Sequence, residues 1–172
     1  VRGVHFQPVS YFGRHDEALE TRYTLDRLMA DLSEQARISP DAFLPSRCDH
    51  PLCGFHASFL LEKDGSLRPL ARFQHASRAR GTARDNRAYV ANHWRRAPDE
   101  PQPDLSGEMD FDTFLYRLRQ RSLTLSAMAF QDAMNLNMER LRQCTLHVWR
   151  DGAIVPFCAN YLTPMKARGD LE

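Results

Sequence analysis

"CDHPLCGFHASFLLEKDGSLRPLARF", residues 48–73, joins a cysteine-rich segment to two apolar runs that flank an Asp-Gly pair at 64–65. An Asp-Gly pair between apolar runs is a strong short-range signal for a β-hairpin. The segment "QCTLHVWRDGAIVPFC", residues 143–158, repeats the arrangement around a second Asp-Gly pair at 151–152. We therefore expect two β-hairpins, each with a Cys-x-x-His motif before or within its first strand.

The chain has four cysteines: Cys48, Cys53, Cys144 and Cys158. The first two stand close together, as one tight turn of a metal site requires. Cys144 lies seven residues before Asp151, and Cys158 lies six residues after Gly152. A near-symmetric hairpin then places both of these thiols at its open end. The four thiolates can therefore form one site, with two ligands from a loop and two from the base of a hairpin.

Two metals compete for such a site. Iron–sulfur clusters tolerate irregular ligand spacing because the ligands come from a scaffold and not from one knuckle. Zinc competes because "HPLCG", residues 50–54, is similar to a zinc knuckle in which a histidine replaces the first cysteine, giving His50/Cys53 ligation. The Cys-x-His and Cys-x-x-His pairs have separations that do not suit a Rieske cluster. Cys158 could also be an ordinary buried apolar residue.

Histidines beside cysteines raise a further alternative, a nucleophilic enzyme. His56 or His147 could in principle activate a thiolate, but close neighbours on a strand point to alternating faces. The sequence also contains no GxSxG-like nucleophile elbow. These histidines are better interpreted as hydrogen-bond donors around the site or as partly buried residues.

Helical periodicity is clearest in "YTLDRLMADLSEQA", residues 23–36, with Thr24 as the expected N-cap. A short helix of one or two turns should begin at Ser39-Pro40 and end by Pro45. Two more helices are expected over 111–121 and 126–144. Apolar stripes support these three longer helices: Leu25, Leu28, Met29 and Leu32; Phe111, Phe114, Leu115 and Leu118; Phe130, Met134, Met138 and Leu141. We expect Met134 and Met138 to fill the core.

The opening stretch "VRGVHFQPVSYFGR", residues 1–14, has strand character and begins without methionine, so we interpret the chain as a piece of a longer protein. We expect this stretch to lie at the edge of a sheet. The predicted fold class is α+β. It consists of β-hairpins around a four-cysteine metal site, packed with several helices and preceded by that edge segment.

Composition narrows the class of protein. The 172 residues carry a net charge of +1, so no global field attracts nucleic acid or a membrane. The arginine-rich segment 78–96 is interpreted as a solvated face, and 97–110 as a loop. Without a long apolar run or a signal peptide, we expect a soluble, cytoplasmic protein with no membrane span. In that reducing compartment cysteines are metal ligands or free thiols more often than disulfides.

Five segments resemble the C-terminal portion of radical SAM enzymes of the tetraether lipid synthase and pterin methyltransferase type. They are "VRGVHFQPVSYFGR", "YTLDRLMADLSEQA", "FLPSRCDHPLCGF", "MAFQDAMNLNMERLRQC" and "HVWRDGAIVPFCANYLT". The DG-x-x-x-P-x-C ending also resembles the auxiliary-cluster hairpin of SPASM-type proteins. The resemblance implies that residues 1–20 end a catalytic barrel and that 21–172 form a metal-cluster domain.

The resemblance also implies the cofactors and the partner. The four cysteines would bind an iron–sulfur cluster of the 4Fe–4S type, with zinc as the alternative. S-adenosylmethionine would be bound by the protein's own N-terminal radical SAM barrel. The CxxxCxxC motif of the radical-generating cluster is absent from the chain, so the chain alone should be inactive. Members of the family act on different substrates, so the resemblance implies none in particular.

Two functions are therefore expected from the sequence. The first is an auxiliary iron–sulfur domain of a radical SAM enzyme, supporting electron transfer or substrate positioning in radical methylation or C–C bond formation. The alternative is a zinc-stapled, non-catalytic binding module whose aromatic and arginine residues hold a partner. Metal content separates the two hypotheses.

Overall fold

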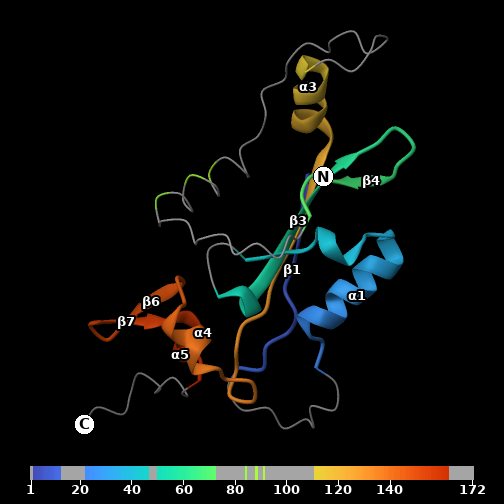
Figure 1. Cartoon of the computed structure of the whole chain (residues 1–172). Coiled ribbons are helices and arrows are strands. Elements are labelled where there is room, and N and C mark those ends of the chain that lie inside the picture. Colours follow the sequence, from blue (N-terminus) through green and yellow to red (C-terminus); the bar gives the residue numbers. More distant parts are fainter. Residues whose placement is uncertain are drawn as a thin grey trace, which may run out of the picture.

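The computed structural model of the chain describes residues 2–12, 22–46, 50–72, 84, 88, 91 and 111–162 (Figure 1). Its elements, in chain order, are β1 (Gly3–Phe6), α1 (Leu25–Ala36), η1 (Pro40–Ala42), β2 (Leu44–Pro45), η2 (Pro51–Cys53), β3 (Gly54–Leu61), β4 (Leu67–Pro69), α3 (Phe111–Arg121), β5 (Ser122–Met128), α4 (Met138–Arg142), β6 (His147–Arg150), β7 (Ala153–Pro156) and α5 (Phe157–Asn160). The predicted loop 97–110 lies outside the described residues, as does the arginine-rich segment 78–96 except for three isolated positions.

A mixed sheet of five strands forms the centre of the molecule. β1, β5, β3 and β2 lie side by side in that order, and β4 pairs with the later part of β3. β1 and β5 are parallel, whereas β3 is antiparallel to each of its neighbours. The α+β class predicted from the sequence is confirmed. The strand β1 stands at one edge of this sheet, as expected for the opening stretch.

Both Asp-Gly pairs form the predicted hairpin turns. β3 pairs antiparallel with β4 across the first turn, where Gly65 has a φ of 85°. β6 pairs with β7 across the second turn, in which Asp151 and Gly152 have φ values of 49° and 83°. Two successive residues with positive φ are typical of a type I′ turn, whose twist matches that of the strands. Local turn chemistry therefore determines both hairpins.

The hydrophobic core lies between α1 and one face of the sheet. Thr24 is the N-cap of α1, as predicted, and Arg37 ends the helix in the left-handed region with a φ of 53°. The apolar stripe of α1 faces the sheet, with Leu28 buried and its neighbours partly buried. The buried core residues are Leu28, Ile38, Ala42, Phe43, Phe55, Ala57, Phe59, Leu125 and Ala127. The predicted short turn also forms, as η1 with Ser39 as its N-cap.

The predicted helix over 126–144 is wrong. β5 occupies the start of that range as an inner strand of the sheet, residues 129–137 follow without helix, and α4 is confined to Met138–Arg142. β5 forms backbone hydrogen-bonded ladders with β1 on one side and β3 on the other. Its alternating residues Leu125 and Ala127 are buried in the core. Pairing on both edges, together with burial of one face, outweighs the helical spacing of the local sequence.

The expectation that the methionines fill the core is also wrong. Met134 and Met138 are 76% and 56% exposed, because the segment that carries them leaves the sheet and follows the surface. The stripe expected on α3 is incomplete as well. That helix forms over the predicted residues, but Phe111 at its start is 71% exposed.

Replacement of Met134 tests this correction. We expect Met134→Gln to change the free energy of unfolding by less than about 0.5 kcal/mol, because replacing an exposed side chain removes few packing contacts. Leu141→Ala on α4 is the matched control, since Leu141 is buried and its truncation should cost roughly 2 kcal/mol or more. Urea denaturation measures both values. A loss of similar size in the two variants would contradict the surface position of Met134.

Candidate functional site

Three of the predicted ligand cysteines come from separate parts of the fold. Cys53 ends η2 at the start of β3, Cys144 lies between α4 and β6, and Cys158 is in α5. All three are free thiols. Figure 1 shows the start of β3 next to the group formed by α4, α5 and the β6–β7 hairpin. Cys48, the fourth predicted ligand, lies outside the described residues.

The hairpin β6–β7 brings Cys144 and Cys158 to its open end. The last bond between its two arms is donated by the backbone N–H of Phe157 to the carbonyl of Leu146, at 2.9 Å. Cys144 precedes that bond by two residues, and Cys158 follows it by one. The arrangement inferred from the spacing around the Asp-Gly turn is the one observed.

Burial dominates the electrostatic environment of Cys158. Burial raises the pKa of the Cys158 thiol, and the sulfurs of Cys144 and Cys53 raise it further. The backbone N–H of Gln131 and the guanidinium of Arg140 act in the opposite direction. Because burial is the largest of these effects, the surroundings of Cys158 favour its neutral thiol.

N–H groups point at two of these sulfurs. The backbone N–H of Gln131 donates to Sγ of Cys158 at 3.3 Å, and Nε of Arg140 donates to Sγ of Cys53 at 3.3 Å. The Cys144 thiol itself donates to the carbonyl of Leu146 at 3.0 Å. Hydrogen bonds to sulfur are one of the means by which proteins tune iron–sulfur clusters. These contacts fix the positions of the Cys53 and Cys158 side chains.

The donor set suits a thiolate-bound metal in its chemistry. Soft sulfur ligands select zinc or iron–sulfur clusters. Within the described ranges, however, no three or more histidine, cysteine, aspartate or glutamate side chains stand close enough together to hold a metal ion. The ligand set of Cys48, Cys53, Cys144 and Cys158 therefore stays a prediction.

The histidines singled out from the sequence have local structural positions. Nδ1 of His50 accepts the backbone N–H of Leu52 at 3.1 Å, so His50 serves as the N-cap of η2. His56 lies within β3 opposite Ser126 of β5. His147 begins β6 and is exposed. The capping role of His50 accounts for a histidine before "PLC" without a metal.

Asp132 connects the segment after β5 to the N-terminal part of the chain. Its side chain, only 1% exposed, accepts two hydrogen bonds from the guanidinium of Arg22, at 2.7 and 3.0 Å. It also accepts the backbone N–H groups of Tyr11 at 2.9 Å and Met134 at 3.0 Å. Burial by itself raises the pKa of Asp132, but Arg22 and these N–H groups bring it below the usual value of 3.8. The carboxylate therefore stays charged although it is buried.

Gln131, the neighbour of Asp132, supports the cysteine region. It is 1% exposed, and its side-chain oxygen accepts the backbone N–H of Asn137 at 2.6 Å. Asn137 is in turn the N-cap of α4, the helix that carries Arg140. Gln131 therefore connects two places in the fold. Its backbone N–H contacts Cys158, and its side chain contacts Asn137 at the start of α4. No pattern in the sequence singled out Gln131 or Asp132.

Aromatic rings attach α5 to the rest of the fold. Phe157 lies 4.6 Å from Phe130 and 4.8 Å from Tyr161, measured between ring centroids. Phe12 from the N-terminal segment lies 5.0 Å from Tyr161. Such pairs stabilise packing beyond the apolar area that they bury. They hold the Cys158 helix against segments that are distant in sequence.

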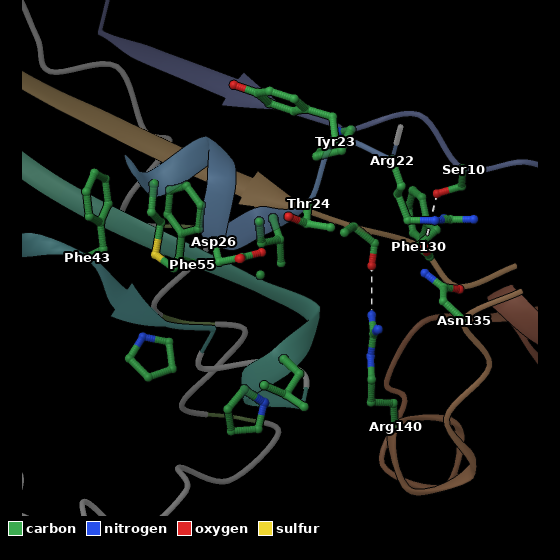
Figure 2. A pocket seen from close by; sticks show the side chains of 18 of the residues that line it. Ser10, Arg22, Tyr23, Thr24, Asp26, Phe43, Phe55, Phe130, Asn135 and Arg140 are labelled. Atoms are coloured by element: carbon green, nitrogen blue, oxygen red, sulfur yellow. Dashed lines mark hydrogen bonds between the residues drawn. The ribbon is translucent and has the colours of Figure 1, made fainter. Parts of the chain in front are cut away.

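A cavity of about 870 Å³ adjoins the cysteine region (Figure 2). Its walls are mainly apolar, with charged and polar side chains at a few points: Ser10, Arg22, Thr24, Asp26, Asp41, Asn135 and Arg140. Arg140 belongs to both places, since it lines the cavity and also donates to Cys53. The volume is in the range of small-molecule sites. The cavity has no local signal in the sequence, because its lining comes from many separate segments.

Comparison with known proteins supports a distant relationship to a methyltransferase. No family model matches the chain. The chain is similar to an enzyme named 7,8-dihydro-6-hydroxymethylpterin dimethyltransferase from Methanocaldococcus jannaschii, with 25% identity over 209 aligned positions that cover 92% of the chain. It spans only 41% of the length of that relative. The pterin methyltransferase part of the resemblance inferred from the sequence is thus supported at this level.

Within the described segments, no helix combines the length and the apolar character needed to cross a membrane.

Proposed function

We propose that this chain is the metal-cluster domain of a radical SAM enzyme, in which Cys48, Cys53, Cys144 and Cys158 hold an auxiliary iron–sulfur cluster. One observation carries the proposal. The β6–β7 hairpin brings Cys144 and Cys158 to its open end, and the buried Arg140 of α4 donates to the sulfur of Cys53. The similarity to a dimethyltransferase over most of the chain supports the choice of enzyme class.

The residues around the thiols would prepare them for the cluster. When bound, the cluster supplies one-electron chemistry or a scaffold for substrate. The N–H groups of Gln131 and Arg140 donate to the sulfurs of Cys158 and Cys53 and hold them in place. Because hydrogen bonds to sulfur raise the reduction potential of a cluster, both groups would set the potential at which it works. The role would be electron transfer or substrate positioning in radical methylation or C–C bond formation.

The remaining parts of the enzyme are also proposals. Residues 1–20 would end the catalytic barrel, and 21–172 would form the cluster domain. The edge position of β1 supports this division, since an edge strand has a side available for pairing. The N-terminal barrel would bind S-adenosylmethionine and would be the partner of the present domain in the cytoplasm.

Metal analysis of variants tests the assignment. We expect the intact protein, reconstituted without oxygen, to contain more iron and sulfide than its Cys144→Ala variant, by roughly the content of one cluster. His50→Ala is the discriminating control. It should leave iron and sulfide unchanged, because His50 is a helix cap and not a ligand in the proposed set.

Two results would reject the iron–sulfur assignment. The first is an unchanged iron and sulfide content in Cys144→Ala. The second is a protein that contains zinc and loses it in His50→Ala, which would favour the zinc-stapled binding module. Inductively coupled plasma analysis for iron and zinc, with a colorimetric sulfide assay, distinguishes these cases on the same samples.

A further inference from the structure

The charges around the cavity are balanced at all but one buried position. Arg22 is neutralised by Asp132, which accepts both of its terminal nitrogens. Asp41 is neutralised by Arg72, with 2.7 Å between the nearest charged atoms. Asp26 is exposed to solvent at the edge of the cavity. The remaining charge is that of Arg140, which is only 8% exposed.

Arg140 has hydrogen-bonding capacity that the protein does not use. Its Nε donates to the sulfur of Cys53, and Nη2 donates to the carbonyl of Ala129 at 2.8 Å. A guanidinium has five N–H donors, so others are left over. Within the part of the chain that the structure describes, no carboxylate lies within ion-pair distance of Arg140, and no acceptor is found for Nη1. Arg140 lines the cavity, so an anionic group placed there would be in position to accept these remaining N–H groups.

The cavity places this cation opposite an apolar wall. Figure 2 shows the aromatic rings of Phe43 and Phe55 on one side and the side chains of Arg140 and Asn135 on the other. Further apolar lining comes from α1, through Leu25 and other residues. A ligand that fills the cavity would therefore have its apolar part against the aromatic side and its polar group against Arg140.

We infer that this cavity binds a small organic anion with an apolar or aromatic body, and that Arg140 recognises its anionic group. Carboxylates, sulfonates and phosphates share the planar or forked oxygen arrangement that a guanidinium binds with two parallel hydrogen bonds. The inference goes beyond the proposed function and requires no metal. Because Arg140 also contacts Cys53, the anionic end of the ligand would lie beside the cysteine region.

Two fluorescent dyes of similar shape test the inference. Anilinonaphthalene sulfonate carries an anionic group, whereas phenylnaphthylamine is neutral. With the full chain, we expect Arg140→Met to weaken binding of the sulfonate by about tenfold or more, since a hydrogen bond to a charged group contributes that much affinity. Binding of the neutral dye should change by less than about twofold. Arg142→Met, on the exposed side of the same helix, is the matched control and should affect neither dye.

A competition experiment with the unmodified chain keeps the inference testable if Arg140→Met does not fold, which circular dichroism would reveal. Decanoate should displace the bound sulfonate dye, and decyltrimethylammonium, with the same alkyl chain and the opposite charge, should not. Equal displacement by both surfactants would overturn the inference. So would a folded Arg140→Met that loses affinity equally for both dyes or for neither.

Discussion

Asp132→Asn should lower the free energy of unfolding by about 3–5 kcal/mol, the usual cost of removing one partner from a buried ion pair. The substitution keeps the size of the side chain but removes its charge. One oxygen becomes an NH₂ group, which cannot accept a hydrogen bond from Arg22. The side chain of Arg22, which is only 22% exposed, would then be left without a charged partner. Urea denaturation followed by circular dichroism measures the loss.

Asp151→Asn is the matched control for this prediction. Asp151 is 91% exposed at its side chain, and its nearest charged neighbour, Arg150, is 3.5 Å away. An exposed ion pair contributes little, so the control should change stability by less than about 1 kcal/mol. Asparagine also accepts the positive φ at this turn position. Similar losses in the two variants would show that Asp132 does not hold the fold together.

The pH dependence of stability gives a second readout for Asp132. Its pKa is lower in the folded protein than the usual 3.8, so the contribution of the carboxylate is fully present above that value. The contribution is lost as the pH falls through the lowered pKa. The difference in stability between the native chain and Asp132→Asn should therefore shrink in strong acid. A difference that stays constant down to about pH 2 would contradict the assignment.

Gly54→Ala should also destabilise the fold strongly, by about 3 kcal/mol or more, at the upper end of overpacking effects. A Cβ at this position would stand 2.2 Å from the carbonyl oxygen of Ala127 in β5. The obstacle is backbone and cannot rotate away, so β3 and β5 would have to separate at this point. Gly54 follows Cys53 and lines the cavity, so the change would also disturb the candidate site.

Gly65→Ala is the control that separates the effect of a close contact from the effect of backbone strain. Gly65 has a φ of 85°, and a Cβ there would meet nothing within 4 Å. That substitution costs only the backbone strain of the left-handed region, about 1–2 kcal/mol. Gly54 has a φ of −178°, which any residue can adopt. Only the close contact would therefore destabilise Gly54→Ala. If Gly65→Ala were the more damaging of the two in urea denaturation, the close approach of β3 to β5 would be wrong.

Local signals in the sequence were sufficient to predict α1, η1 and both hairpins. The helix α1 has an N-cap at Thr24 and an apolar stripe at helical spacing, and these features act over a few residues. The Asp-Gly turns need no information from outside the hairpin, because positive φ values are a property of the turn residues themselves. The approach of Cys144 to Cys158 follows from the second hairpin in the same way.

Strand β5 shows where local signals are insufficient. The sequence around Ser126 and Met128 has spacing compatible with a helix, yet these residues belong to an inner strand. Its backbone partners are β1 and β3, which lie far away in the sequence. In the structure Asn135 and Asn137 accept backbone N–H groups through their side chains, which competes with helical hydrogen bonds, and the prediction of one continuous helix did not take this signal into account.

The candidate site depends on both kinds of information. Clustering of cysteines in two regions was evident from spacing, which is why the thiols could be named in advance. The position of Cys53 beside Arg140, the burial of Arg140 and the cavity depend on contacts between segments that are far apart in the sequence, such as Arg140 with Cys53. No local pattern encodes such contacts, because they result from packing the whole chain around the β3–β5 pair and bridging it through Asp132.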